Sequence, residues 1–165
     1  MNWYVIFTLS YKTKRILSNL NTKKELEAFI PGYEVCHRYT KEIKIKPMFD
    51  NYIFVKTTLN QEEFNSLLYR MKDDNDGLIK QLKNNETSAL TLKEIEFFNL
   101  VLDNHHIVRL SHGYQEGGKT HVVDGPLVAY ENHIVKVDKH NCCAFLDLIF
   151  FDRRIKLGID ILSKK

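Results

Sequence analysis

The stretch KPMFDNYIFV at residues 46–55 decides the fold expected for the first part of the chain. Its Asp-Asn step predicts a tight turn, because Asn tolerates a left-handed backbone and both side chains bond to nearby backbone groups. The β-branched and aromatic run that follows predicts a strand. Tyr52 and Phe54 share one face of this strand, whereas Ile53 and Val55 share the other. The aliphatic face is the better candidate for the core.

Hydrophobic periodicity around this stretch predicts the order βαββαβα, which is typical of an open α/β sandwich. The continuous apolar run at residues 3–9 predicts a strand covered on both faces, in the middle of its sheet. Capping residues predict helix starts at Asn60 and, with Glu three residues later, at Thr91. The other expected elements are an amphipathic helix at 10–20, a β-ribbon at 33–46 with its turn near residues 40–41, and a strand at 78–82.

The pattern changes after residue 107. Residues 111–118 are rich in Ser, Gly and Gln and lack a repeating apolar face, which predicts a linker. The rest of the chain shows no helical period and predicts about five short strands that form a small β-barrel. These strands are expected at residues 122–123, 127–128, 134–137, 144–151 and 155–162. The expected fold class is therefore α+β, with an N-terminal α/β sandwich at 1–110, a linker at 111–118 and a five-stranded barrel at 119–165.

Composition indicates a soluble cytoplasmic protein. The chain has 165 residues and a formal net charge of +3, which favours contact with a polyanion only weakly. It has three cysteines, Cys36, Cys142 and Cys143, and this odd number with two adjacent members fits a reducing compartment. No signal peptide and no bilayer-spanning run is visible, so we expect no membrane association. We expect a monomer.

The sequence lacks the groups that catalysis needs. We find no nucleophile paired with a base, and the Gly117–Thr120 stretch lacks the first glycine of a phosphate-binding loop. A metal site built from His133, His140, Cys142 and Cys143 is unfavourable, because adjacent residues of a strand project to opposite sides. We therefore expect a protein that is not an enzyme and that uses no metal and no cofactor.

Three blocks of sequence resemble the NusG family, in which an N-terminal domain is followed by a KOW domain. They are WYVIF at 3–7, KPMFDNYIFV at 46–55, and GPL at 125–127 followed by Glu131, Ile134 and KVD at 136–138. Within the family, the chain is most similar to the LoaP antiterminator branch. That similarity lies in SHGY at 111–114, KVDKH at 136–140 and LGIDIL at 157–162.

The resemblance implies a transcription elongation or antitermination factor that works by binding. It implies that the N-terminal domain docks on the clamp helices of RNA polymerase through an aromatic hollow, which maps onto Phe7, Tyr52 and Phe54. Aromatic side chains suit such a contact because they give a large area at a low entropic cost. The alternative is that all three residues belong to an ordinary core.

The C-terminal domain is expected to bind RNA or protein, since small barrels of this kind use one edge for that purpose. An RNA hairpin is the first candidate and a ribosomal protein the second. The candidate edge consists of basic residues beside successive turns: Lys136, Lys139, His140, Arg153, Arg154 and Lys156. The adjacent arginines can equally serve solubility alone. A second hypothesis is that the chain is a ribosome-associated or translation-linked RNA-binding protein.

Overall fold

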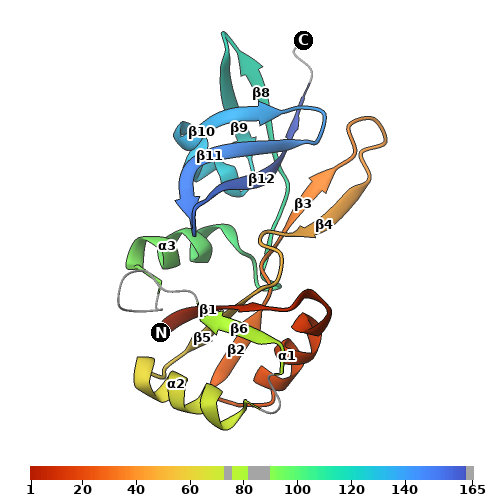
Figure 1. Ribbon diagram of the computed structural model, residues 1–165. Helices are drawn as coiled ribbons and strands as arrows, with labels where there is room; N and C mark the ends of the chain where they lie inside the picture. Colours follow the sequence, from red (N-terminus) through yellow and green to blue (C-terminus); the bar gives the residue numbers. More distant parts are fainter. Residues whose placement is uncertain (73–75, 82–89, 163–165) are drawn as a thin grey trace. The chain divides into compact units, whose positions relative to one another are not determined.

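The computed structural model describes residues 1–72, 76–81 and 90–162, and the chain divides into two compact units (Figure 1). The first unit contains Met1–Ile30 and Phe49–Glu96. The second contains Pro31–Met48 and the chain from Phe97 onward. The architecture is a mixture of helices and mainly antiparallel sheets, in agreement with the α+β prediction.

A four-stranded sheet with the order β2-β5-β1-β6 forms the first unit. Its strands are β1 (Asn2–Thr8), β2 (Leu26–Phe29), β5 (Tyr52–Thr57) and β6 (Leu78–Gln81). Strand β1 lies inside the sheet and pairs antiparallel with both β5 and β6, which confirms its predicted central place. Strand β2 was not predicted, and residue 82, the expected end of β6, lies outside the described residues.

Helices α1 (Thr13–Leu20) and α2 (Gln61–Arg70) cover the same face of this sheet (Figure 1). A short 3-10 helix, η1 (Ser10–Lys12), leads into α1. The predicted cap of α2 is confirmed, because Asn60 Oδ1 accepts from Glu63 N and Glu63 Oε2 accepts from Asn60 N, both at 2.9 Å. The core between sheet and helices is aliphatic with two aromatic rings: Tyr4, Ile6, Ile16, Leu20, Leu26, Ala28, Ile53, Val55, Phe64, Leu67 and Met71.

The second unit begins with the predicted β-ribbon. Strands β3 (Gly32–Cys36) and β4 (Ile43–Pro47) pair antiparallel, and β7 (Ile107–Val108) adds to β3 in parallel. The turn between β3 and β4 includes Lys41 with φ of 61°, which agrees with the predicted turn position.

A curled five-stranded sheet, the half-barrel, forms the rest of the second unit, in the order β10-β11-β12-β8-β9 (Figure 1). Its strands are β8 (Ser111–Glu116), β9 (Lys119–Asp124), β10 (Ile134–Asp138), β11 (Cys143–Phe150) and β12 (Arg153–Ile161). Helix α3 (Leu92–Val101) contributes Phe97 and Phe98, whose rings lie 5.1 Å from Tyr130 and 5.0 Å from Phe150 respectively.

Two local predictions for the C-terminal region differ from the structure. Residues 111–118 were expected to be a linker, but they form β8 and the turn to β9, because β8 pairs with both β9 and β12. Residues 127–128 were expected to be a strand, but they lie in the 3-10 helix η2 (Pro126–His133). Gly125 has φ of 98°, and a proline fits the start of a helix, since its φ is fixed and it has no N–H to satisfy.

None of the helices in the described ranges combines the length and the apolar character that a bilayer crossing requires.

Candidate functional site

The residues expected to contact RNA polymerase lie in one aromatic cluster of the first unit. The register between β1 and β5 places Phe7 opposite Tyr52 and Val5 opposite Phe54, so these side chains share the face of the sheet away from the aliphatic core. The rings of Phe7 and Tyr52 meet edge to face, with centroids 5.4 Å apart. The predicted division of β5 into an aromatic and an aliphatic face is confirmed, because Ile53 and Val55 lie in the core beneath the helices.

Three further aromatic residues complete this aromatic face, and only one of them stands in the stretch that decided the fold. Phe49 stacks between Tyr52 and Phe54, at 5.9 and 6.0 Å. Phe29 of the unpredicted strand β2 lies 5.8 Å from Phe54 and 5.7 Å from Trp3. Phe29 was not predicted because strand β2, which carries it, was not predicted.

The three residues predicted to contact RNA polymerase differ in how far their side chains are exposed. Phe54 is fully buried at 0% exposure and Tyr52 is 8% exposed, whereas Phe7 is half-buried. The turn before β5 is held by Asn51, which has φ of 67° and whose carbonyl oxygen accepts from Thr8 N at 2.9 Å. Asn therefore supplies the left-handed position that the sequence predicted. The turn fixes where Tyr52 begins its strand beside Phe7.

The basic residues expected at the edge of the barrel do not gather at one end of it. Lys136 of β10 and Lys156 of β12 both pair in register with Phe145 of β11, so the three residues form a cross-strand row. The Lys136 ammonium lies 5.7 Å from the centre of the Phe145 ring. Lys139 and His140 stand at the turn between β10 and β11.

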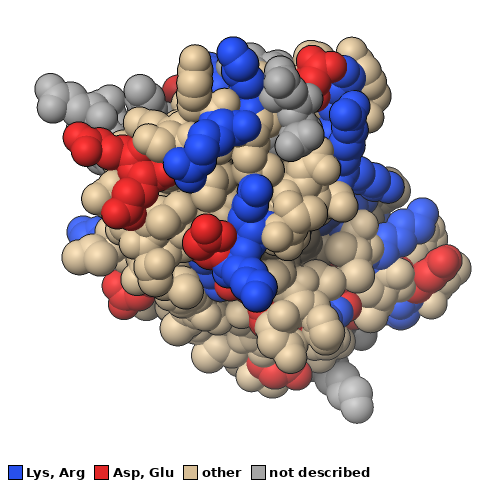
Figure 2. Space-filling view, turned by 90° about the horizontal axis from the view of Figure 1, so that it is seen from below, with Lys and Arg blue, Asp and Glu red and all other residues tan. Residues whose placement is uncertain are grey.

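Arg153 and Arg154 stand at the opposite end of the β11–β12 hairpin, where they pair with Phe150 and Ile149. The eight residues of β11 separate the two ends by about 25 Å at the usual rise of a strand. All six basic side chains are exposed. Figure 2, seen from the side on which α1 and α2 lie in Figure 1, shows lysine and arginine side chains interspersed with acidic ones on that face.

The comparison with known families identifies the class of protein. The family model described as "Transcription termination factor nusG" matches residues 1–100. The chain belongs to the NusG family. Members of this family are transcription elongation or termination factors that bind RNA polymerase and are not enzymes. No curated protein gives a significant match to the chain.

The family match covers the whole aromatic face of this NusG-family chain, from Trp3 in β1 to Phe54 in β5. The Lys136–Phe145–Lys156 row and the half-barrel lie beyond the matched residues. The family match therefore covers the first part of the chain and does not extend to the half-barrel.

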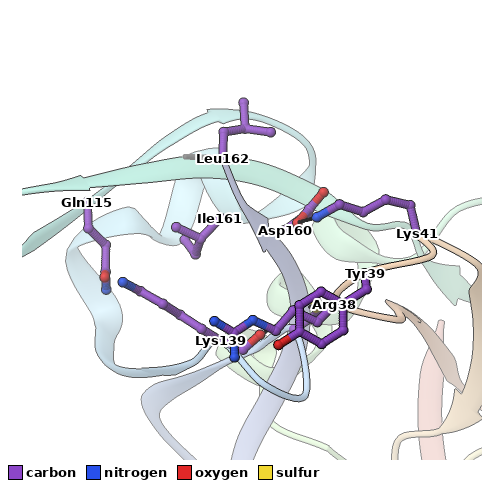
Figure 3. Close-up of a pocket in the computed structure, with 9 residues that line it drawn as sticks. Arg38, Tyr39, Lys41, Gln115, Lys139, Asp160, Ile161 and Leu162 are labelled. Carbon is purple, nitrogen blue, oxygen red and sulfur yellow. Dashed lines mark hydrogen bonds and ion pairs between the residues drawn. The ribbon is translucent and has the colours of Figure 1, made fainter. Parts of the chain in front are cut away.

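A cavity of about 460 Å³ opens in the second unit. Figure 3 shows Arg38 beside Tyr39 from the β3–β4 turn, and Lys139 extending toward Gln115 of β8. The Arg38 guanidinium lies 5.3 Å from the Tyr39 ring centre, and Tyr39 is 76% exposed. Lys41 donates to Asp160 Oδ1 at 2.9 Å, so Arg38 and Lys139 leave the cavity with an excess of positive charge.

Two cysteines far apart in the sequence meet beside this cavity. Cys36 at the end of β3 and Cys142 in the β10–β11 turn are both buried, next to the buried Asp160 of β12. Burial, followed by a hydrogen bond with Cys142, raises the pKa of the Cys36 thiol to about 12. The metal site weighed from sequence combined Cys142 with its neighbour Cys143. The structure brings Cys142 to Cys36 instead, and no local motif signals that pairing.

Proposed function

We propose that this NusG-family chain is a transcription elongation and antitermination factor of the LoaP branch, which acts by binding and not by chemistry. In this proposal an N-terminal domain, residues 1–110, docks on the clamp helices of RNA polymerase. A KOW domain, formed by the half-barrel and therefore including β8 from residue 111 onward, binds an RNA hairpin or a partner protein such as a ribosomal protein. Bridging the clamp disfavours paused states of the enzyme. The observation that carries the proposal is the aromatic face within the family-matched residues.

The exposure of the individual rings suggests which of them contacts the partner and which of them supports the contact. Phe54 is fully enclosed and stacks on Phe49, so its part is to support the surface from behind. Phe7 is half-buried and stands edge to face with Tyr52, so it is the ring best placed to receive an apolar side chain from a partner helix. A rigid aromatic pair of this kind loses little conformational freedom on binding.

The docking proposal is tested by the affinity of the full chain for RNA polymerase. Tyr52→Ala combined with Phe54→Ala should abolish binding, while the half-barrel of the second unit stays folded. Because this double variant also removes buried aromatic contacts, Phe7→Ala is the sharper test, with an expected loss of about 30-fold, which is the effect of a 2 kcal/mol hot spot. Tyr69→Ala is the matched control, since Tyr69 is 71% exposed on α2.

Affinity for polymerase at the wild-type level in both Phe7→Ala and the double variant would exclude the docking surface. A loss of affinity in Tyr69→Ala equal to that in Phe7→Ala would also exclude it, because the two rings stand on different elements. Binding of RNA without any binding of polymerase would favour the second hypothesis, a ribosome-associated RNA-binding protein.

The cross-strand row on the half-barrel supports an RNA contact. A ring flanked by two lysines is the arrangement that lets an unpaired base stack while neighbouring phosphates are neutralised. Phe145 is half-buried and lies between Lys136 and Lys156, which are both exposed. Lys139 extends the positive charge from this row to the turn at its end, where His140 also stands. Arg154 stands two residues from Lys156 on the same face of β12, about 7 Å along the strand, so it adjoins the row on the side away from Lys139 and His140.

The RNA proposal is tested by binding of the full chain to a leader-RNA hairpin, and to an unrelated hairpin, across a salt series. Three or four phosphate contacts predict a log–log slope of about three. Lys136→Gln with Lys156→Gln should lower this slope by one to two units, as estimated from the same rule. Arg153→Ala with Arg154→Ala is the comparison at the neighbouring positions of β12: a slope loss confined to this variant would place the contact beside Phe150 and Ile149 instead of Phe145.

Equal, weak binding of both hairpins that no variant changes would mean that the half-barrel binds protein. The proposed role in antitermination would then be wrong. Docking of the N-terminal domain on RNA polymerase would be unaffected, because it is tested separately.

A further inference from the structure

A cluster of two thiols and one carboxylate lies inside the second unit, apart from the aromatic face and the cross-strand row. It consists of Cys36, Cys142 and Asp160, whose side-chain ligand atoms all lie within 4.8 Å of one another. All three residues are buried, with exposures of 6%, 3% and 8%. They come from β3, from the β10–β11 turn and from β12, so the fold gathers them from three separate segments.

The backbone holds the Cys142 thiol in place by means of a strained, left-handed conformation. Cys142 has φ of 52°, in the left-handed region that a residue with a side chain adopts only when its surroundings determine it. Its carbonyl oxygen accepts from Ile159 N at 3.0 Å, which ties the turn to β12 beside Asp160. The turn therefore aims Cys142 at Cys36 and Asp160, whereas its neighbour Cys143 begins β11 outside the cluster.

We propose that Cys36, Cys142 and Asp160 form a binding site for a thiophilic divalent cation, with Zn²⁺ as the ion that fits this chemistry best. Two sulfur ligands select a soft or borderline ion over Mg²⁺ or Ca²⁺, which take oxygen ligands. Three protein ligands leave the fourth tetrahedral position for a water molecule or an exogenous ligand. Cys142 and Asp160 both line the cavity of about 460 Å³, which provides an entry path and room for that ligand.

The formal charges of the site balance when it is loaded. Binding of the ion displaces the protons of both thiols into solvent. The two thiolates and one carboxylate then carry three negative charges, the cation supplies two positive charges, and the Lys41 ammonium supplies the third. Lys41 donates to Asp160 Oδ1 at 2.9 Å and keeps this oxygen oriented, as outer-sphere partners of metal ligands do. Figure 3 shows Lys41 reaching toward Asp160. The Lys41 side chain is 55% exposed, so it remains hydrated on its outer side.

The test uses the full chain, reduced and stripped of metal, titrated with Co²⁺ and then with Zn²⁺. Cobalt should give the near-ultraviolet thiolate charge-transfer band and the visible absorption of a tetrahedral site, saturating at one ion per chain, and zinc should displace it. Cys36→Ala and Cys142→Ala should each weaken binding at least about 100-fold, the upper end of the effect of losing an outer-sphere partner. Cys143→Ala is the matched control and should bind as the wild type does.

A second measurement keeps the proposal decidable if a ligand variant folds poorly. Zinc should raise the melting temperature of the wild type and of Cys143→Ala, and should raise that of Asp160→Asn much less. Absence of the thiolate band in the wild type would overturn the site, as would an unchanged band in Cys36→Ala. Closure of a Cys36–Cys142 disulfide in air by a chain that binds no cobalt when reduced would overturn it as well.

Discussion

Replacing Phe54 and Phe7 separately by alanine should separate support of the aromatic face from contact with its partner. Phe54 is fully buried and stacks on Phe49, so Phe54→Ala removes a whole ring from a closed site. Substitutions of this kind cost about 3–5 kcal/mol. Phe7 is half-buried and contacts Tyr52, so Phe7→Ala should cost only about 1 kcal/mol of stability, from partial burial and one aromatic pair.

The fluorescence of Trp3 reports the unfolding of the first unit in a urea titration. It is the single tryptophan of the sequence, it is 2% exposed, and its ring lies 5.7 Å from that of Phe29 in the same aromatic face. With a urea dependence of about 1 kcal/mol per molar, Phe54→Ala should lower the fluorescence midpoint by roughly 3 M or more, and Phe7→Ala by about 1 M.

The order of the two variants in affinity for RNA polymerase should be the reverse of their order in loss of stability, when both are compared under conditions in which each is folded. Phe7→Ala should lose about 30-fold in affinity, the value for a 2 kcal/mol contact, and Phe54→Ala should lose less. Equal midpoints for the two variants, or a folded Phe54→Ala chain that binds more weakly than Phe7→Ala, would refute the division between supporting and contacting rings.

Three further outcomes follow from local structure. Asn60→Ala removes the cap of α2 and should lower the unfolding free energy by about 1 kcal/mol. Urea unfolding followed by tryptophan fluorescence measures this change. Gly158→Ala should cost about 3 kcal/mol or more in a urea titration followed by circular dichroism, because a Cβ there would lie 1.8 Å from the Glu34 carbonyl oxygen. Burial opposes ionisation of Asp103, yet its hydrogen bonds, including one from Arg109, lower its pKa overall. It therefore stabilises the fold above its unfolded pKa of about 3.9, and this contribution is lost as pH falls through the folded pKa, so Asp103→Asn should be less stable at pH 7 and approach the wild type below about pH 4.

The sequence predicted elements that carry their own local signal. The cap at Asn60 and the turn at Asn51 depend on residues adjacent in sequence, and both appear in the structure as predicted. The two faces of β5 follow from strand alternation alone. Strand β2 was missed because it has only four residues and is held by pairing with β5, which no local pattern reveals.

The differences in the C-terminal region have physical causes of the same kind. Strand β8 has few apolar residues, and its extended conformation comes from pairing with β9 and β12. Residues 127–128 read as a strand by composition, but the left-handed Gly125 and the fixed φ of Pro126 begin a 3-10 helix. The approach of Cys142 to Cys36 depends on how β3 and the half-barrel pack, and sequence spacing carries no information on that.

Docking on the clamp helices is tested by binding of the full chain to two forms of bacterial RNA polymerase, the intact enzyme and an enzyme that lacks the tips of the clamp helices. The two enzymes would be compared by equilibrium titration with labelled chain, and Tyr69→Ala would serve as a fully competent control. Docking on the clamp helices predicts saturable binding to the intact enzyme and a loss of at least about 100-fold, or roughly 2.7 kcal/mol, when the clamp-helix tips are removed. Equal affinity for the two enzymes would contradict it.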